Sequence, residues 1–342
     1  MAKAVFFEGP RKAVVRQVEL REMGDRDVRA KTLYSGISHG TEMQIYTGTA
    51  HQYTKFYDEK TKLYRPGKPG MCYPLQYGYM SVARVQEVGS AVETVKTGDI
   101  IASYHPHQDE YIIDKDEVVA VMPEHIPAKQ GIFMANLVTT YNGILDGGIN
   151  LGESVAVFGQ GVLGLIAVKL AKLSGAQKVF AVDLIKKRLE MSKEFGADFV
   201  INPRDCKDVA LYIKEHTDNR GVDIAYEVSS SGQGLNQAIR SVVYDGTVMA
   251  ISWYRTPLTD VHLGEEFHVN RVRIKSTQVG GIGHELSNRW DKARRISAAI
   301  NLFPQIPLEK LITHEIPFED APKAYELVDK TAKDVIQVML KC

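Results

Sequence analysis

The chain has 342 residues, of which 44% are hydrophobic and 25% charged, a balance typical of a soluble globular protein of about two domains. Its 42 Lys and Arg equal its 42 Asp and Glu, so no charge excess favours nucleic acid or an anionic membrane as a partner. No stretch approaches the ~20 apolar residues of a membrane span, and the start has no signal-peptide pattern. Three scattered cysteines form neither a disulfide framework nor a four-cysteine zinc lobe. We therefore expect a cytoplasmic protein whose partners are small molecules.

The first 120 residues contain short β-rich runs such as KAVFFEG and MSVARVQEVG, which predict a small, mostly antiparallel β domain. Residues 49–70 are aromatic and charged and end in PGKPG, so we expect a long exposed loop of the kind that often acts as a lid. Later, apolar strands alternate with amphipathic helices, which predicts a parallel sheet covered on both faces. The predicted fold is α/β: a β-rich domain of residues 1–135 and 291–342, and a doubly wound Rossmann domain of residues 136–290.

The stretch SVAVFGQGVLGLIAVKLAKLSGAQKVFAVD predicts a dinucleotide site. It places Gly159, Gly161 and Gly164 between an apolar strand and a helix, and it ends in Asp183. The first glycine permits a tight turn, the second leaves room for the pyrophosphate, and the third lets helix and strand pack closely. The helix that starts at Val162 offers free amides to the diphosphate, and the acid accepts hydrogen bonds from the adenosine ribose.

Asp183 would repel the extra phosphate of NADP, so the sequence favours NAD as cofactor. The basic residues Lys186, Lys187 and Arg188 leave NADP open, because a side chain turned inward would receive a phosphate, although a solvated helical turn also explains them. Arg188 is also a candidate for contact with the adenosine ribose, because it follows the acid closely in the sequence. Further candidates for cofactor contact follow later Rossmann strands, and these are Ser229, Ser230, Ser252 and Gln278.

These features together resemble the medium-chain dehydrogenase/reductase superfamily, on its zinc alcohol, polyol and threonine dehydrogenase side. The resemblance spans nearly the whole chain and is most specific in GISHGTEMQIYTG, GYMSVARVQEVG and SVAVFGQGVLGLIAVKLAK. It implies that the β-rich domain is GroES-like and that the active site faces the nicotinamide in the cleft between the domains. It also implies a homodimer or homotetramer, because relatives commonly pair the edges of their Rossmann sheets.

Zinc-type members of this superfamily typically show a segment like GICGTDLHIYTG, in which Cys binds zinc, Thr relays the proton and His passes it to solvent. This chain is one residue longer there. Matching from the left puts Ser38 on the cysteine. Matching from the right puts His39 there, with Thr41 on the relay hydroxyl and Gln44 on the distal histidine. The two alignments remain open at this point.

The other zinc ligands of the resemblance are also replaced. In the segment that resembles GHEASGVVVEVG, Tyr79 stands for the ligand histidine and Met80 for the glutamate, and Asn136 stands near the third position. Phenol and thioether are poor zinc ligands beside imidazole, thiolate and carboxylate. We therefore expect no zinc. A metal held by three histidines stays an alternative, although two of them, His105 and His107, would diverge on a strand.

Without zinc, hydride transfer still needs a group that takes the alcohol proton or hydrogen-bonds the oxyanion. Tyr79 is one candidate, but its ordinary pKa of ~10 requires a cationic neighbour before it acts as a base at neutral pH. His39, with an ordinary pKa of ~6.5, is either that neighbour or the base itself. Thr41 would continue a hydroxyl relay. Both Tyr79 and His39 also have structural explanations, as a strand tyrosine that fills the former zinc space and as a loop histidine.

The residues offered to substrate are mostly polar, which fits a polyhydroxylated compound better than an aliphatic chain. They are Ser38, Gln44, His105, His107, Asn136 and Trp253. The pattern GTE, GYM and STQVGG resembles a branch related to bacteriochlorophyllide dehydrogenases and to sugar or cyclitol dehydrogenases. We predict a zinc-independent, NAD-dependent oxidoreductase acting on a secondary alcohol. The alternatives are an NADPH-dependent enone or quinone reductase and a nucleotide-binding protein without catalysis.

Overall fold

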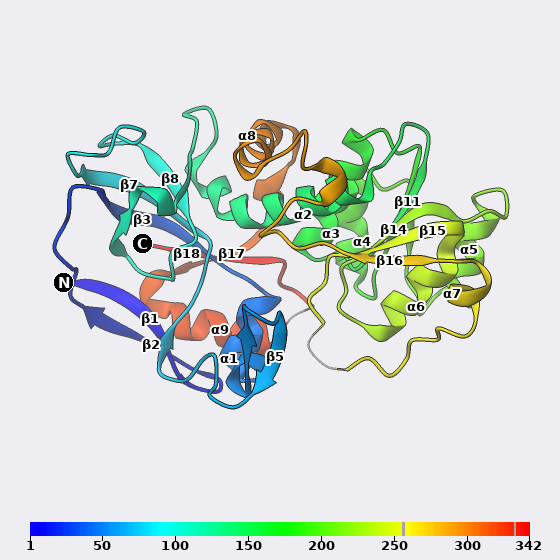
Figure 1. Cartoon of the computed structure of the whole chain (residues 1–342), viewed down its shortest axis with the longest axis horizontal. Helices are drawn as coiled ribbons and strands as arrows, with labels where there is room; N and C mark the ends of the chain where they lie inside the picture. The colour runs from blue at the N-terminus through cyan, green and yellow to red at the C-terminus, as the bar shows by residue number, and fades with distance from the viewer. Residues whose placement is uncertain (255–256, 332) are drawn as a thin grey trace. The chain divides into compact units, whose positions relative to one another are not determined.

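The computed structural model describes residues 1–254, 257–331 and 333–342, and the chain forms two compact units (Figure 1). Unit 1 comprises Met1–Ala135 and Leu308–Cys342, and unit 2 comprises Asn136–Pro307. Residues 291–307, predicted to belong to the β-rich domain, lie in unit 2 instead. No helix of the described ranges is both long and apolar enough to cross a membrane.

Residues 291–307 belong to unit 2 because helix α8 (Lys292–Leu302) is tied to it by a buried arginine. Arg295 donates hydrogen bonds to the side chain of Asn142 and to the carbonyls of Val279 and Gly281. A buried guanidinium needs such partners. The sequence pattern of this helix does not reveal which partners it meets.

Unit 1 is built on a seven-stranded sheet with the order β10-β8-β7-β3-β18-β17, in which β9 also pairs with β3. All pairs are antiparallel except β17 with β18, as expected for a mostly antiparallel domain. The long strand β3 lies between β7 and the C-terminal strand β18. The strands of this sheet are β3 (Asp27–Ile37), β7 (Ser81–Val88), β8 (Ile100–Ser103), β9 (Glu110–Asp114), β10 (Val118–Val121), β17 (Ile312–Pro317) and β18 (Gln337–Lys341).

Two smaller sheets complete the strands of unit 1. One has the order β2-β1-β6, and the other is the hairpin β4-β5. Their strands are β1 (Ala2–Gly9), β2 (Lys12–Val18), β4 (Lys55–Asp58), β5 (Leu63–Pro66) and β6 (Leu75–Gln76). The hairpin corrects the prediction of a long exposed loop over residues 49–70, because part of this segment forms paired strands. Tyr57 and Tyr64 face each other across it with ring centroids 5.1 Å apart, and such cross-strand aromatic pairs stabilise a hairpin.

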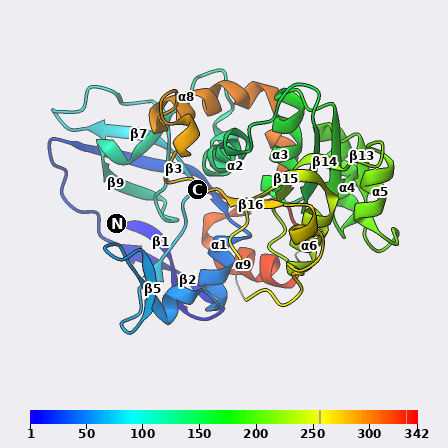
Figure 2. The same cartoon turned by 45° about the vertical axis from the view of Figure 1, so that its right-hand side comes forward.

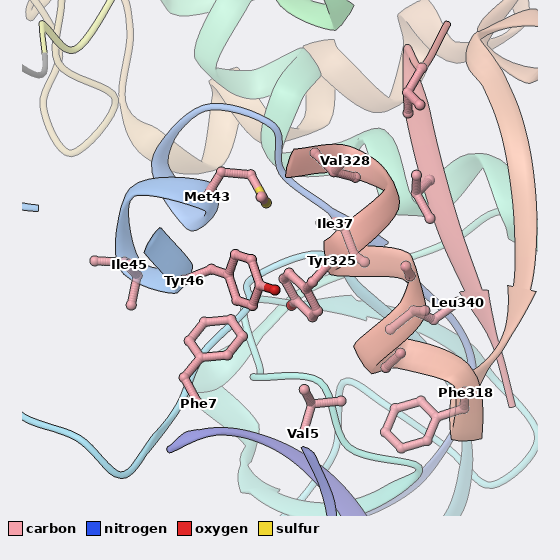
Figure 3. Packing of buried hydrophobic residues seen from close by; sticks show 14 of the residues in the cluster. Val5, Phe7, Ile37, Met43, Ile45, Tyr46, Phe318, Tyr325, Val328 and Leu340 are labelled. Atoms are coloured by element: carbon pink, nitrogen blue, oxygen red, sulfur yellow. The ribbon is translucent and has the colours of Figure 1, made fainter. Parts of the chain in front are cut away.

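The helices of unit 1 pack on the β1–β2 side through an aromatic cluster, shown in Figure 3. Tyr46 of α1 (Thr41–Thr47) stacks on Tyr325 of α9 (Ala321–Lys330) with centroids 5.0 Å apart, and the edge of Phe7 meets both rings. Helices about 280 residues apart in sequence are thus fixed against each other. The 3₁₀ turns are η1 (His51–Tyr53), η2 (Lys115–Glu117), η3 (Ala128–Phe133), η6 (Leu308–Leu311) and η7 (Phe318–Asp320).

Unit 2 has the predicted doubly wound sheet. Its six strands lie in the order β13-β12-β11-β14-β15-β16 and every pair is parallel. The strand order therefore reverses between β11 and β14, which is where Rossmann sheets bind a nucleotide. The strands are β11 (Ser154–Phe158), β12 (Lys178–Val182), β13 (Phe199–Ile201), β14 (Val222–Glu227), β15 (Val242–Ala250) and β16 (Arg273–Ser276).

Helices pack on both faces of this sheet (Figure 2), with α3 against α4 and α5 against α6. The predicted fold class, a β-rich domain plus a Rossmann domain, is confirmed. The helical elements of this part of the chain are α2 (Met134–Gly147), α3 (Val162–Leu173), α4 (Lys186–Phe195), α5 (Val209–Glu215), α6 (Gly232–Ser241), α7 (Glu266–Val269), η4 (His284–Leu286) and η5 (Phe303–Gln305).

Candidate active site

Two residues that replace metal ligands in the resemblance contact each other in unit 1. Ser38 follows β3 and Tyr79 precedes β7, and these two strands are neighbours. The contact between the two strands extends to Met80, which precedes β7, because the Gly36 amide donates to the Met80 carbonyl at 2.9 Å. The Tyr79 phenol consequently donates a hydrogen bond to the Ser38 hydroxyl at 2.5 Å. We call Tyr79 and Ser38 the hydroxyl pair.

The environment of Tyr79 keeps its phenol protonated. Burial raises the pKa of Tyr79 above its ordinary value, and the charge of Glu42 adds to this, whereas the hydroxyls of Ser38 and Thr41 lower it. The net direction is upward. A base made from tyrosine requires the opposite direction, a lowered pKa. Tyr79 is therefore built to donate a hydrogen bond or a proton at neutral pH.

Behind the hydroxyl pair lies a carboxylate that the sequence analysis did not select. Glu42, in the first turn of α1, is fully buried. Its Oε2 accepts a hydrogen bond from the Ser38 amide at 2.9 Å, and its Oε1 contacts Nε2 of His107 at 2.6 Å and accepts from the Tyr325 hydroxyl. The sequence contains one signal for Glu42, an acid among the apolar residues of a short helix, because a buried acid requires partners.

The structure places the two predicted substrate histidines in different surroundings. His107 is fully buried, with Nδ1 2.6 Å from the Ser35 hydroxyl and Nε2 on Glu42. His105 is partly exposed and stacks on Tyr111 with ring centroids 4.0 Å apart, and burial lowers its pKa. Both nitrogens of His107 are thus engaged inside unit 1. For His105, a role in substrate binding stays a prediction. For His107, the buried contacts indicate a structural role within unit 1 instead.

Side chains that could form a metal site do not gather in the described residues. Within 1–254, 257–331 and 333–342, no group of three or more His, Cys, Asp or Glu side chains is arranged to hold a metal ion. His39, the alternative occupant of the cysteine position, is partly buried in the turn before α1. Its role as base, like that of Thr41 as relay, stays a prediction.

Two other predicted substrate residues present unpaired oxygens. Gln44 Oε1, on α1, and Asn136 Oδ1, near the start of α2, are buried and have no hydrogen-bond partner among the described residues. Such atoms are rare in folded proteins and indicate where a ligand or water donates a hydrogen bond. Trp253, beyond the end of β15, is partly buried.

In unit 2 the glycines of the nucleotide motif meet the constraints that their roles require. Gly159 follows β11 with φ of 97°, and a Cβ there would lie 2.8 Å from the Ser229 backbone. A Cβ on Gly164 would lie 1.8 Å from the Gly159 carbonyl oxygen. A Cβ on Gly161 would meet nothing within 4 Å, which is the open approach that a pyrophosphate needs beside the start of α3 at Val162. These residues fit a dinucleotide.

The acid and the basic residues of the motif are also placed by the structure. Asp183 accepts hydrogen bonds from the amides of Gln160 at 2.6 Å and Ile185 at 2.8 Å, so its carboxylate is fixed beside the glycine turn. Lys186 and Lys187 are exposed, whereas Arg188 is partly buried. Burial lowers the pKa of Arg188 and the nearby Asp183 charge partly offsets this. Of the three basic residues, Arg188 is the one that is partly buried, and its pKa is influenced by the charge of Asp183.

The predicted serines gather at the carboxyl ends of β14 and β15. The Ser229 hydroxyl donates to the buried Glu227 carboxylate at 2.5 Å, and the Ser230 amide donates to the Ser252 hydroxyl at 2.9 Å. Gln278, beyond β16, accepts a hydrogen bond from the Gly280 amide through its side-chain oxygen. Ser229 and Gln278 thus each have a local partner, and their contact with a cofactor stays a prediction.

Comparison with known proteins finds dehydrogenases that are similar to this chain. Residues 162–298 match the model of a family described as Zinc-binding dehydrogenase. The chain is 26% identical over 346 aligned residues to D-guloside 3-dehydrogenase of Escherichia coli (strain K12), covering 98% of this chain and 99% of that protein. It is 28% identical over 358 aligned residues to L-threonine 3-dehydrogenase of Pyrococcus horikoshii, covering 95% and 94%.

A solved structure has the same fold. The crystal structure of 2R,3R-butanediol dehydrogenase from Bacillus subtilis matches with a TM-score of 0.82 and 20% identity, covering 100% of both chains. Together the comparisons support the medium-chain dehydrogenase/reductase superfamily that the motifs indicated. The prediction that the chain is a dehydrogenase or reductase acting on CH–OH groups is confirmed.

Proposed function

We propose that this protein catalyses zinc-independent hydride transfer between NAD and a secondary alcohol group of a polyhydroxylated or bulky substrate. The observation that carries the proposal is the hydroxyl pair, in which Tyr79 donates to Ser38 at 2.5 Å at positions where the resemblance expects zinc ligands. When substrate binds, this phenol would turn its one O–H from Ser38 to the substrate oxygen and stabilise the developing charge there by a hydrogen bond, in place of the Lewis acid that zinc provides.

The residues of unit 2 support the cofactor part of the proposal. A bound nicotinamide dinucleotide supplies the hydride acceptor. Gly159 and Gly164 fix the turn, Gly161 leaves the approach to the helix open, and Asp183 accepts from two backbone amides beside it. A carboxylate there favours the unphosphorylated ribose of NAD and disfavours the phosphate of NADP.

The residues of unit 1 support the absence of zinc in the proposed reaction. The oxygens of Ser38 and Tyr79 are neutral hydroxyls that bond each other, and neutral hydroxyls do not match the thiolate, imidazole and carboxylate set that holds zinc. The donors at these positions do not fit the metal. Tyr79 then donates a hydrogen bond or proton at the substrate oxygen, and His39 is the candidate base that takes the alcohol proton, with Thr41 as a relay.

A polyhydroxylated substrate is supported by the unpaired oxygens and by the relatives. Gln44 Oε1 and Asn136 Oδ1 are buried acceptors without a described partner, and each would accept a hydrogen bond from a substrate hydroxyl. The curated relatives are named for a guloside and for threonine, each with its 3-position as the site of dehydrogenation. Both names fit a secondary alcohol in a polar molecule.

The raised pKa of Tyr79 and the inward Arg188 favour one second candidate, an NADPH-dependent reductase of enones or quinones. A protonated phenol suits proton donation to a reduced double bond, and an arginine near the ribose suits a phosphate. Either candidate function is compatible with the proposed homodimer or homotetramer. The same holds for the proposed location in the cytoplasm.

Turnover assays with a panel of polyols, glycosides and enones, each with NAD(H) and NADP(H), separate these candidates. We expect oxidation of a secondary alcohol with NAD, without loss after exhaustive chelation and with substoichiometric zinc in the purified protein. A reaction only with enones and NADPH would establish the second candidate. One zinc per chain that is required for turnover would overturn the zinc-independent mechanism.

A further inference from the structure

We infer that Glu42 and His107 are positioning residues that hold the hydroxyl pair, Tyr79 and Ser38, in its working geometry. The inference rests on the proposed function and deepens it, because it names the groups that take over the orienting part of a metal centre. It concerns residues of unit 1 alone. Neither residue is placed at the reacting atoms.

Glu42 fixes the Ser38 side of the pair. A carboxylate without water requires several hydrogen bonds, because an isolated charge in the interior is strongly unfavourable. Glu42 receives them from the Ser38 amide at 2.9 Å, from His107 at 2.6 Å and from the Tyr325 hydroxyl. The amide that Glu42 holds belongs to the same residue whose hydroxyl accepts from Tyr79. Any displacement of this carboxylate therefore moves the acceptor of the phenol.

His107 fixes the Tyr79 side of the pair. Its amide donates to the Tyr77 carbonyl at 3.2 Å, and its ring lies against Gly78. A Cβ on Gly78 would lie 2.6 Å from the imidazole, and the φ of Gly78 is 122°. Only glycine satisfies both conditions without strain. His107 thus contacts both residues before Tyr79, Tyr77 through its amide and Gly78 through its imidazole.

The same imidazole is linked to the residue after Tyr79. His107 Nδ1 lies 2.6 Å from the Ser35 hydroxyl, which donates to the Met80 carbonyl at 3.4 Å. The Met80 carbonyl also accepts from the Gly36 amide at 2.9 Å. The backbone on both sides of the phenol is consequently bonded to one network, which begins at Glu42 and passes through His107.

The network is sealed from substrate. Ser35, Glu42, His107 and Tyr325 are each 0% exposed. A serine, a histidine and an acid in this sequence of contacts also form the nucleophilic triad of hydrolases, but a triad serine must reach its substrate. Complete burial excludes that use in this conformation, so the network acts through Ser38 and Tyr79.

The test uses the full-length protein and a matched pair of tyrosines that stack on each other, visible in Figure 3. Tyr325→Phe removes the hydroxyl that donates to Glu42. Tyr46→Phe, the control, removes a hydroxyl that donates to the Arg11 carbonyl. Glu42→Gln is the second variant, because it keeps the shape and removes the charge. Thermal unfolding establishes that each variant is folded.

The readout is the carbon-13 resonance of the Tyr79 phenol carbon in protein labelled at tyrosine, assigned by its loss in Tyr79→Phe. We expect Tyr325→Phe and Glu42→Gln to shift this resonance and to lower kcat by about 10- to 100-fold with little change in KM, as for other outer-shell partners. Tyr46→Phe should change neither. In Glu42→Gln the alkaline limb of the pH profile should move to lower pH, because the Glu42 charge raises the pKa of Tyr79.

Folded Tyr325→Phe and Glu42→Gln proteins with the wild-type Tyr79 resonance and pH profile would overturn the positioning role. If Glu42→Gln does not fold, Tyr325→Phe decides alone. The resonance does not depend on turnover. A Tyr79→Phe protein with full activity would therefore remove Tyr79 from the proposed reaction, while the resonance would still decide whether Glu42 and His107 hold the phenol.

Discussion

The nucleotide turn of unit 2 and the hydroxyl pair of unit 1 differ in how their residues are brought together. The turn is local, because strand, glycines and helix follow one another between residues 154 and 173, and Asp183 directly follows the next strand. The hydroxyl pair is held by segments spread from Ser35 to Tyr325. A local site is encoded by spacing, whereas a site assembled by sheet pairing is encoded by contacts that spacing does not reveal.

The largest expected effect tests the nucleotide turn of unit 2, which is the local site. A Cβ on Gly164 would lie 1.8 Å from the Gly159 carbonyl oxygen, and backbone on both sides leaves little room to relax. We expect Gly164→Ala to destabilise unit 2 by about 3 kcal/mol or more, measured by chemical denaturation. Gly161→Ala is the matched control, since a Cβ there meets nothing within 4 Å.

Gly161→Ala should leave the folding transition nearly unchanged and weaken NAD binding, because the methyl group would occupy the approach of the pyrophosphate. Equal stability of the two alanine variants would show that the turn tolerates a side chain at its point of closest approach. That result would remove the geometric argument for the dinucleotide site.

The next largest effect tests the hydroxyl pair of unit 1, which is the site assembled by sheet pairing. Tyr79→Phe removes one hydroxyl that donates to Ser38, so the fold should persist while the group that contacts the substrate oxygen is lost. We expect kcat to fall by about 10²- to 10⁴-fold, the usual contribution of general acid and base catalysis. Steady-state kinetics with the preferred alcohol measures this.

Tyr77→Phe provides the control for Tyr79→Phe, because its ring meets Tyr79 edge-on with centroids 6.2 Å apart without belonging to the hydroxyl pair. Its kcat should remain within about twofold of the wild type. Full activity in Tyr79→Phe would transfer the acid and base role to His39, the second candidate of the sequence analysis.

The sequence predicted the local features well and the assembled ones less well. The two-unit fold and the parallel sheet followed from strand and helix periodicity, because each pattern is confined to neighbouring residues. Ser38 and Tyr79 were selected individually, but their contact depends on the pairing of β3 with β7. Glu42 was missed, because an acid among apolar residues signals that partners are needed but does not reveal that His107 and Tyr325 provide them.

Two differences have the same origin. His107 was assigned to substrate as one of a set of polar residues, yet the bridge between Ala4 and Gln108 draws this segment into the sheet, and the ring is buried. The hairpin within residues 49–70 was taken for a loop, because its strands are short and largely exposed and give no alternation of apolar and polar residues. Long-range pairing decides both cases.

A smaller effect sharpens the assignment of the cofactor. Asp183→Asn keeps one of the two oxygens that accept from the Gln160 and Ile185 amides and removes the charge that disfavours a ribose phosphate. We expect NAD binding to weaken by about tenfold, as for loss of a charged hydrogen-bond partner, and NADP binding to improve. Fluorescence titration with both reduced cofactors measures the ratio. A wild-type protein that binds NADPH more tightly than NADH would contradict the assignment and favour the reductase.

The smallest effect is expected at the fully buried Tyr226 of unit 2, and the half-buried Tyr254 provides the comparison. Tyr226 is fully buried and its hydroxyl has no hydrogen-bond partner among the described residues, whereas the Tyr254 hydroxyl donates to Glu227 at 2.7 Å. Removing an unpaired buried hydroxyl relieves its desolvation penalty, so Tyr226→Phe should stabilise the protein by about 1 kcal/mol, whereas Tyr254→Phe should destabilise it by about 1.5–3 kcal/mol. Denaturation at neutral pH measures both changes.

The same pair predicts how stability depends on pH. Burial raises the pKa of both phenols above the ordinary value, so above pH ~10 the unfolded chain loses protons that the folded chain retains. The stability contributed by the protonated phenols is therefore fully present below pH ~10 and declines as pH rises. Tyr226→Phe removes one of these groups, and its free energy of unfolding should fall less between pH 9 and 11 than that of the wild type. An equal decline in both proteins would mean that the Tyr226 hydroxyl is solvated in the folded state.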